Sequence, residues 1–328
     1  MAVERKFYLE DIPLEEAWGR LIPALESAGR WAPLPGEELA LEEALGRVTA
    51  EPVWAALSSP GYHASAMDGY AVRAADTYGA TEKEPGYLRV TDDGPARYVD
   101  TGDPLPPWAD AVIMIEHAQL QTNDSGRESI EIVAAVAPFT NVRPMGEDMV
   151  ATELVLPANQ VLRPVDLGAL AGCGHPTVKV RRRPRVAIIP TGTELITPEQ
   201  AAKSGLRPGD IIEYNSLVLA TQVRDWGGIP TRFPIIIDDY ERIKIAVQEA
   251  AAAHDLVLVN AGSSAGSEDF TAQVVEDLGT LLVHGVAVRP GHPVVLGTVT
   301  EQKTPIIGVP GYPVSCALTS EIFVEPLL

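Results

Sequence analysis

The second half of the chain alternates short apolar runs with amphipathic segments, and this alternation constrains the fold more than any other feature. From Arg185 onward, the runs typical of buried strands are RVAIIP, PTRFPIII, LVLVN and PIIGVP. Segments with helical periodicity lie between them: SLVLATQVRDWGG, YERIKIAVQEAAAAH and FTAQVVEDLG. Strands that alternate with helices of this length are typical of a parallel, doubly wound sheet. Ligands of such sheets bind at the carboxyl ends of the strands.

Residues 256–293 contain the elements of a ligand site. LVLVN runs into AGSSAGSEDF, in which small residues are followed by Glu268 and Asp269. Small residues before a helix leave backbone N–H groups open to an anion, and carboxylates suit a divalent cation beside a phosphate. The segment VRPGHP then adds Arg289, a fixed cation, and His292, a titratable ring. Taken alone, this stretch is equally compatible with a phosphorylated ligand and with an ordinary turn followed by a hairpin.

The other predicted strand ends favour the ligand site. The four ends are Thr191–Glu194, Asp238-Asp239, Asn260–Gly262 and Pro310–Pro313. Three of them carry a carboxylate at or soon after the strand, with Asp269 following the third, and two carry a glycine-rich bend. Because ligands of a doubly wound sheet bind where the strand ends meet, we expect these groups to converge.

The first half of the chain has a different pattern. Residues 9–50 predict two helices: EEAWGRLIPALESAG with a kink at Pro23, and the shorter LALEEALGRVTAE, which ends near Gly46. Residues 51–146 contain short strand-like runs separated by turn residues: YAVR, YLRV, RYVD, AVIMIE and ESIEIVAAV. Short strands of this kind are typical of a small β-barrel or β-meander.

These patterns together predict a multidomain α/β protein. Residues 1–52 with 147–180 are expected to form an α+β first domain that dimerises, because their amphipathic helices have too little chain to bury both faces alone. Residues 53–146 are expected to form an inserted, small β-barrel-like domain. Residues 181–328 are expected to form the doubly wound α/β domain.

Charge and composition disfavour several classes of function. The 328-residue chain is 46% hydrophobic and carries a net charge of −20, which repels nucleic acid and anionic membranes. The short basic cluster Arg181–Arg185 is interpreted as solvated charge at a domain junction. No apolar run approaches a membrane span, and the charged start predicts no signal peptide. Cys173 and Cys316 offer neither a disulfide framework nor a metal pair, which fits the reducing cytoplasm.

Six sequence words carry a resemblance to a known family. In chain order they are SAMDGYAV (65–72), GED (146–148), TGTEL (191–195), AGSSAGSEDF (261–270), RPGHP (289–293) and PGYPVS (310–315). Together they resemble the molybdopterin molybdenumtransferase family, which includes MoeA and the E domain of gephyrin. The resemblance implies insertion of molybdate into adenylylated molybdopterin, with hydrolysis of the adenylate. It also implies an elongated homodimer, with each site between the α/β domain of one subunit and the first two domains of the other.

The resemblance also implies roles for individual residues. Catalysis and Mg²⁺ binding are expected of five carboxylates, Asp68, Asp148, Glu194, Asp238 and Asp269, the first two reaching the site across the dimer. Substrate binding is expected of Thr191, Gly192, Gly262, Ser263, Ser264, Gly266, Arg289, His292, Pro310, Gly311 and Ser315.

Three departures from the family pattern leave alternatives open. The family usually has SGGVSVG at 260–266, KPGKP at 289–293 and PGNP at 310–313, where this chain has NAGSSAG, RPGHP and PGYP. His292 keeps a positive charge only when it is protonated, and Tyr312 replaces an amide with a phenol. A preference for tungstate or a modified pterin, or a non-catalytic pterin-binding or scaffold role, therefore stays open. The preceding adenylylation step is a weaker alternative, because stand-alone adenylyltransferases lack the SAMDGYAV region.

The end of the sequence is a further departure. The family normally continues with a fourth, small β domain, whereas this chain stops at Leu328. We therefore expect either a trimmed chain or one that naturally continues differently, and in the trimmed case weak turnover.

Overall fold

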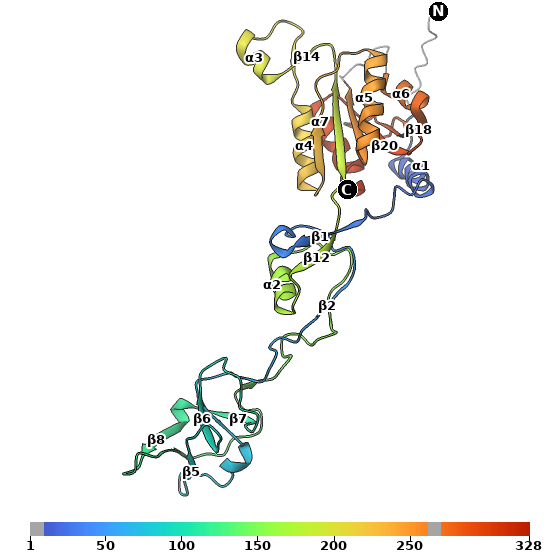
Figure 1. Ribbon diagram of the computed structural model, residues 1–328. Coiled ribbons are helices and arrows are strands. Elements are labelled where there is room, and N and C mark those ends of the chain that lie inside the picture. The colour runs from blue at the N-terminus through green and yellow to red at the C-terminus, as the bar shows by residue number, and fades with distance from the viewer. Residues whose placement is uncertain (1–9, 262–269) are drawn as a thin grey trace, which may run out of the picture. The chain divides into compact units, whose positions relative to one another are not determined.

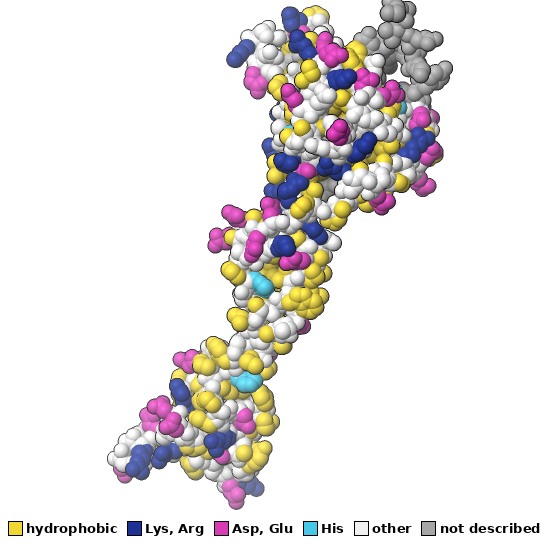
Figure 2. All heavy atoms as spheres, turned by 45° about the vertical axis from the view of Figure 1, so that its right-hand side comes forward, with side chains coloured by type: hydrophobic (Ala, Val, Ile, Leu, Met, Phe, Trp, Pro, Cys, Tyr) yellow, Lys and Arg dark blue, Asp and Glu magenta, His cyan; other side chains and the backbone are white. Residues whose placement is uncertain are grey.

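The computed structural model describes residues 10–261 and 270–328, which divide into two compact units (Figure 1). The α/β unit comprises the described residues up to Pro35 together with Arg181–Leu328, and the β-rich unit comprises Gly36–Val180. Acidic and basic side chains are interspersed on the face shown in Figure 2. Among the described helices, none combines the length and apolarity that a membrane crossing requires.

A mixed sheet forms the centre of the α/β unit. Its six described strands lie in the order β16 (Ile229–Arg232), β13 (Arg185–Thr191), β17 (Leu256–Ala261), β20 (Thr304–Val309), β19 (Val295–Val299) and β18 (Gly279–His284). The first four are parallel, as predicted, whereas β19 pairs antiparallel with β20, and β18 pairs antiparallel with β19. The sequence did not predict this antiparallel edge. It follows from the short turn between Val299 and Thr304, because a turn of that length joins only antiparallel neighbours.

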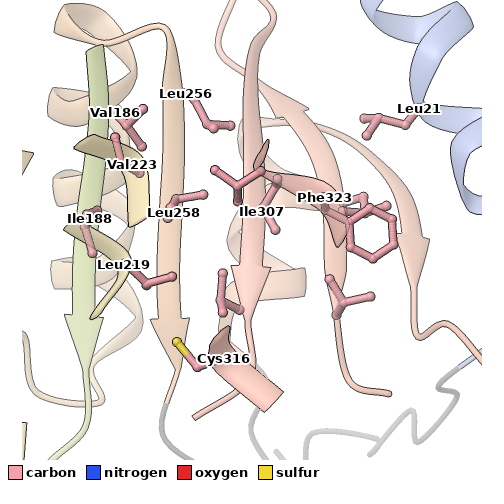
Figure 3. Packing of buried hydrophobic residues seen from close by; sticks show 14 of the residues in the cluster. Leu21, Val186, Ile188, Leu219, Val223, Leu256, Leu258, Ile307, Cys316 and Phe323 are labelled. Carbon is pink, nitrogen blue, oxygen red and sulfur yellow. The ribbon is translucent and has the colours of Figure 1, made fainter. Parts of the chain in front are cut away.

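Helices cover both faces of this sheet. Because strand side chains alternate, Val186 and Ile188 pack on one face, while Ala187 and Ile189 pack on the other. The first face is covered by α1 (Leu14–Ser27), α4 (Asn215–Asp225) and α7 (Pro313–Phe323), and Figure 3 shows its packed side chains. The second face is covered by α5 (Tyr240–Ala253) and α6 (Phe270–Leu278). The mixed α/β class that the sequence predicts is confirmed.

A short excursion leaves the sheet between β13 and α4. It consists of β14 (Leu195–Ile196), α3 (Pro198–Ser204) and β15 (Ile211–Ile212), with β14 and β15 paired in parallel. Thr197 caps the start of α3: its hydroxyl accepts from the backbone N–H of Gln200, while the Gln200 side chain accepts from the Thr197 N–H. This small capped helix was not predicted from the sequence.

Helix α1 belongs to the α/β unit. Its buried residues Ala17, Leu21 and Leu25 lie in the same apolar cluster as α4 and α7, and the Trp18 ring lies 5.4 Å from that of Phe323. The sequence analysis instead grouped residues 1–52 with 147–180. The structure differs because the apolar stripe of α1 finds its partner on the sheet of the α/β unit. Sequence periodicity shows that such a stripe exists, but not which surface covers it.

The second helix predicted in residues 9–50 is not present as an α-helix, because the segment begins at the end of a strand and continues through a 3-10 turn into irregular chain. β1 (Gly36–Ala40) pairs with β12 (Thr177–Arg181), and one 3-10 turn (Leu41–Glu43) follows. Gly46 has φ +71°, so the chain does turn where the sequence predicted the helix end. Leu39 and Ala40 are extended because pairing of β1 with the distant strand β12 outweighs their helical propensity.

Two small antiparallel sheets enclose a core in residues 64–136 of the β-rich unit. In this described region one sheet has the order β6 (Ala96–Val99), β4 (Gly69–Val72), β7 (Ala111–Met114), and the other β5 (Gly86–Arg89), β9 (Glu128–Ile132), β8 (Ala118–Thr122). Tyr70, Leu88, Ile113 and Ile130 are buried in one cluster. The predicted strands are present, and β8 is the one that the sequence analysis missed.

The rest of the β-rich unit has its own apolar cluster. It includes Leu156, Leu162, Leu170 and Val180, from β11 (Leu154–Leu156), α2 (Pro164–Gly172), β12 and the loop between β11 and α2. The short pairs are β2 (Val53–Trp54) with β11, and β3 (Ala64–Ser65) with β10 (Val142–Arg143). Two separate clusters are compatible with the predicted division into a first domain and an inserted domain, which stays a prediction.

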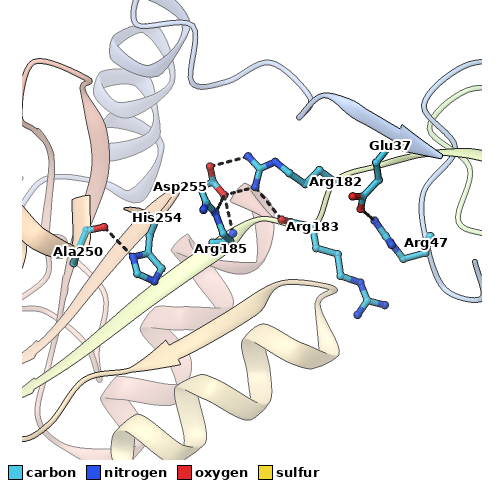
Figure 4. A network of polar contacts seen from close by, with 8 residues as sticks. All are labelled: Glu37, Arg47, Arg182, Arg183, Arg185, Ala250, His254 and Asp255. Carbon is cyan, nitrogen blue, oxygen red and sulfur yellow. Dashed lines mark hydrogen bonds and ion pairs between the residues drawn. The ribbon is translucent and has the colours of Figure 1, made fainter. Parts of the chain in front are cut away.

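The basic cluster at Arg181–Arg185 is largely paired (Figure 4). Arg182 donates through Nη1 and Nη2 to the two carboxylate oxygens of Asp255 at 2.8 and 2.9 Å, and the backbone N–H of Arg185 donates to the same group at 2.7 Å. Burial opposes ionisation of Asp255, but the hydrogen bonds from Arg182 and Arg185 outweigh it and lower the pKa of this carboxyl. The cluster therefore has a structural partner within the α/β unit.

Candidate functional site

The carboxyl ends of three neighbouring strands are tied together by side chains. Asn260, the penultimate residue of β17, pairs in register with Pro190 of β13 and Val309 of β20. The Thr191 hydroxyl donates to the Asn260 carbonyl oxygen at 3.4 Å, and Asn260 Nδ2 donates to the Val309 carbonyl oxygen at 3.2 Å. The predicted convergence of Thr191 with the end of β20 is therefore present at one edge of the sheet.

The first turn of α7 begins at this edge, directly after β20. The backbone N–H groups of Val314 and Ser315 precede the first helical hydrogen bond, which runs from Cys316 N to Tyr312 O. Ser315 is 8% exposed, and its hydroxyl has no hydrogen-bond partner among residues 10–261 and 270–328. A helix start whose N–H groups and serine hydroxyl have no partner among the described residues favours an anionic ligand. Pro310, Gly311 and Ser315 lie here, and their role in substrate binding stays a prediction.

The RPGHP turn lies against the same helix. Gly291 has φ +116°, and a Cβ atom at this position would lie 2.9 Å from the Thr319 hydroxyl of α7, so glycine is required there. Arg289 is exposed in this turn. His292 points part of its ring into the protein, because Nδ1 lies 2.8 Å from the Val286 carbonyl oxygen and 3.3 Å from the Asp11 carboxylate. Its Nδ1 is therefore already engaged by groups of the α/β unit.

Two of the predicted carboxylates sit in adjoining loops of the α/β unit. The Thr193 N–H donates to Asp238 Oδ2 at 3.2 Å, and the Asp238 N–H donates to the Thr193 hydroxyl at 3.3 Å. Gly192 donates to the Ile236 carbonyl at 2.9 Å, so Glu194 and Asp238 are held at the same end of β13. Gly262, Ser263, Ser264, Gly266 and Asp269 lie outside the described residues.

The donor chemistry of these loops fits a magnesium ion. Carboxylate oxygens are the ligands that Mg²⁺ prefers, and the ion commonly binds one or two of them together with water and substrate phosphate. Within the described part of the chain, no group of three or more Asp, Glu, His or Cys residues is placed to hold a metal ion. Glu194 and Asp238 therefore suit an ion whose remaining ligands are supplied by water and substrate.

Asp68 and Asp148 belong to the β-rich unit and are already partnered. Asp68 Oδ1 accepts from the backbone N–H and the hydroxyl of Thr101, both at 2.7 Å, and these hydrogen bonds lower the pKa of Asp68. Asp148 accepts from Arg143 Nη2 at 2.8 and 2.9 Å. Both carboxylates are exposed. Their meeting with Glu194 and Asp238 stays a prediction.

Three residues at the edge were missed in the sequence analysis. Glu213 is 5% exposed and accepts from the Ser216 N–H and hydroxyl, both at 2.7 Å, while Arg232 donates to it at 3.4 Å. Asn215 begins α4 and donates to the Gly311 carbonyl at 2.7 Å. Burial, with the nearby charge of Glu213, raises the pKa of Cys316 to about 12. Asn215 directly precedes a helical run, which is a recognisable signal, whereas the burial of Glu213 depends on distant packing.

Comparison with known proteins covers both halves of the chain. Residues 12–174 match the family described as "MoeA N-terminal region (domain I and II)", and residues 187–328 match the family described as "Probable molybdopterin binding domain". Molybdopterin molybdenumtransferase 2 of Mycobacterium tuberculosis is 36% identical over 311 residues, which is 88% of this chain and 73% of the relative. The molybdopterin molybdenumtransferase of Bacillus subtilis is 31% identical over 306 residues, which is 89% of this chain and 70% of the relative.

A solved structure is similar as well. The crystal structure of the molybdopterin biosynthesis MoeA protein from Pyrococcus horikosii is 33% identical, with a TM-score of 0.81, and the match covers 97% of this chain and 79% of that one. The fold and these matches define a protein that joins a MoeA-type N-terminal region to an α/β domain of the molybdopterin-binding kind. The chain belongs to the molybdopterin molybdenumtransferase family.

Proposed function

We propose that this protein acts in molybdenum cofactor biosynthesis, inserting molybdate into adenylylated molybdopterin with hydrolysis of the adenylate. Family membership supports this function. The single structural observation that carries it is the start of α7 at the strand ends, where the N–H groups of Val314 and Ser315 and the Ser315 hydroxyl provide donors for a phosphate. Arg289, exposed in the RPGHP turn, adds a cation that suits phosphate or molybdate.

The carboxylates supply the other half of the proposed chemistry. Glu194 and Asp238, with Asp269, would hold Mg²⁺, which when bound stabilises negative charge that develops on the phosphate oxygens. An oxygen of water or molybdate attacks the adenylate phosphorus, the bond from that phosphorus to the bridging oxygen breaks, and the bridging oxygen stays on the molybdopterin phosphate. AMP leaves with the attacking oxygen; where that oxygen comes from molybdate, its Mo–O bond breaks as a dithiolene sulfur bonds to molybdenum. Asp68 stays ionised at neutral pH because its pKa is lowered, so it is suited to accept a hydrogen bond from the attacking oxygen or to contact the ion.

The assay is direct. The purified chain, incubated with adenylylated molybdopterin, molybdate and Mg²⁺, should release AMP and form the molybdenum-containing pterin, and removal of Mg²⁺ with a chelator should stop both. Parallel assays with tungstate decide which oxyanion is preferred. Pterin binding without AMP release in any of these conditions would contradict the transferase and leave the binding or scaffold role. The internal contacts of His292 with Val286 and Asp11 are the observation that favours this second candidate.

We also propose that the protein is a homodimer through the β-rich unit. Exposed large hydrophobic side chains accumulate in two segments that β2 and β11 bring together: Leu45, Trp54, Leu57, Val150, Leu154, Val161 and Val165. Trp54 is 55% exposed and lies opposite Leu154 in the β2–β11 pair. Figure 2 shows hydrophobic side chains gathered along one face of the β-rich unit. Contiguous exposed apolar surface of this kind is typical of a protein interface.

The sequence analysis placed dimerisation in residues 1–52 with 147–180, and the structure shifts the proposal because α1 is buried in the α/β unit. Trp54→Asp should convert the dimer to a monomer in sedimentation velocity at micromolar concentration. Leu120→Asp, at an exposed position of β8, is the matched control and should stay dimeric. A wild-type monomer at that concentration would overturn the proposal. The two buried free thiols, Cys173 and Cys316, are compatible with the cytoplasmic location that we infer.

A further inference from the structure

The turn between β20 and α7 has few backbone N–H donors of its own. Its residues are Val309-Pro310-Gly311-Tyr312-Pro313, and proline has no backbone N–H, so Gly311 and Tyr312 supply the only N–H groups between Val309 and Val314. The carbonyl oxygens of this turn are held by side chains from elsewhere. Asn260 Nδ2 donates to the carbonyls of Val309 and Pro310 at 3.2 and 3.0 Å, and Asn215 Nδ2 donates to that of Gly311 at 2.7 Å. Two amides thus hold three consecutive carbonyls.

Both amides are themselves held in place. Asn260 is 3% exposed in β17, and its backbone carbonyl accepts from the Thr191 hydroxyl of β13. Asn215 is the first residue of α4, and the start of that helix is fixed by the buried Glu213 carboxylate, which accepts from the N–H and hydroxyl of Ser216. The turn is therefore braced from the sheet on one side and from α4 on the other.

This bracing has a consequence for an anionic ligand. A carbonyl oxygen that faced the ligand would repel it, whereas a carbonyl that is bonded to an amide is held away from it. We propose that Asn215 and Asn260 are positioning residues, which fix the 309–311 backbone so that the start of α7 receives the phosphate of the pterin substrate. The inference rests on the proposed function for its ligand, but the bracing itself is independent of that function.

The test compares three variants by two measurements. Asn215→Ala and Asn260→Ala should each speed amide hydrogen exchange at Gly311 and Tyr312 in the unliganded protein. Each should also weaken molybdopterin binding, measured by equilibrium dialysis at pH 7, by roughly tenfold, the equivalent of one hydrogen bond. In the double variant, the fold-loss of affinity should be smaller than the product of the two single losses, because both amides hold the same turn. Gln222→Ala is the control: Gln222 lies on α4 and donates to the Ala317 carbonyl of α7 at 3.4 Å, away from the turn. It should change neither measurement.

Asn260→Asp separates positioning from a general loss of structure. The substitution keeps the shape but turns a carboxylate toward the carbonyls of Val309 and Pro310, which repel it when ionised, whereas its protonated form can donate to one of them. The affinity of this variant, relative to wild type at each pH, should therefore recover as pH falls. Unchanged exchange at Gly311 and Tyr312, with wild-type affinity in both alanine variants, would overturn the inference. If the wild type binds no molybdopterin, the proposed function fails, while the exchange measurement still decides whether the amides brace the turn.

Discussion

The two units hold their candidate site residues in opposite ways. At the strand ends of the α/β unit, Asn260 and Glu213 are buried and hydrogen-bonded to groups from other strands and helices, and Ser315 is buried at the start of α7. In the β-rich unit, Asp68 and Asp148 are exposed, and each is held by a nearby loop or turn through Thr101 or Arg143. The α/β site is therefore built by packing, whereas the carboxylates of the β-rich unit are presented by turns.

The two kinds of site residue are suited to different roles. A buried polar group without its partner costs free energy, so the α/β edge keeps one arrangement whether or not a ligand is present. Exposed carboxylates on turns have water as an alternative partner, so they can exchange their present hydrogen bonds for a metal ion or a substrate at small cost. We infer that the α/β edge provides the shape of the binding site, and that the turns provide carboxylates for the reaction.

The largest expected effect tests whether both units serve one reaction. Asp68→Ala in the β-rich unit and Asp269→Ala in the α/β unit should each lower the rate of adenylate hydrolysis by about 10²-fold or more, because each removes a carboxylate proposed to stabilise the transition state. AMP release under saturating substrate is the measurement. Asp124→Ala, on an exposed turn of the β-rich unit, should keep its activity. Near-normal turnover in both site variants would rule out the shared metal site.

The second prediction compares how much one site residue of each unit contributes to the free energy of unfolding. Glu213→Ala should lower the free energy of unfolding by about 2 kcal/mol, because it leaves the buried Ser216 N–H and hydroxyl without their acceptor and removes the partner of Arg232. Asp148→Ala should hardly change it, because exposed ion pairs contribute little. Urea denaturation measures both. Equal losses of unfolding free energy in the two variants would contradict the distinction between site residues held by packing and site residues exposed on turns.

The third prediction concerns pH and the buried thiol at the α/β edge. The pKa of Cys316 is raised from its ordinary 9.0 to about 12, so above pH 9 the unfolded chain releases the thiol proton before the folded one does. Its contribution to stability is complete below pH 9 and falls as pH rises toward 12, by up to about 1.4 kcal/mol per pH unit. Cys316→Ala should remove this component from the stability–pH curve measured in urea. Burial also raises the pKa of Cys173 in the β-rich unit, so Cys173→Ala tests the same effect there. Identical slopes in all three proteins would contradict the assignment.

The smallest effect concerns His292. If this side chain contacts the anionic ligand, affinity for molybdopterin should weaken by a few-fold from about pH 6 to 8, more steeply than in His292→Lys, whose charge persists. An arginine side chain keeps its charge throughout this range, and Asp11, 3.3 Å from Nδ1, is the charged group that faces the ring. Equilibrium dialysis at several pH values measures both proteins. Parallel curves would mean that His292 only packs against Val286 and does not touch the anion.

Local patterns in the sequence predicted a large part of this molecule. The alternation of strands and helices after Arg185, the short strands of 64–132 and the turn at Gly46 are present in the structure. These features depend on side-chain periodicity and on φ values that only some residues adopt, which are properties of a few neighbouring residues. The six sequence words also predicted the family, because each combines residue types whose chemistry and spacing are specific.

Tertiary structure alone decided which distant surfaces meet. It assigned α1 to the sheet of the α/β unit, turned residues 36–40 into a strand beside β12, and reversed β19 against β20. It also buried Glu213 and directed the side chains of Asn215 and Asn260 toward one turn. Asn215 bonds to Gly311, which is 96 residues further along the chain, and Asn260 bonds to Val309, which is 49 residues further along. The physical reason is that the local sequence shows only that an apolar stripe must be buried, or that a buried polar side chain must find a hydrogen-bond partner. Which of many possible surfaces satisfies that need depends on the total free energy of the folded chain, to which every distant contact contributes.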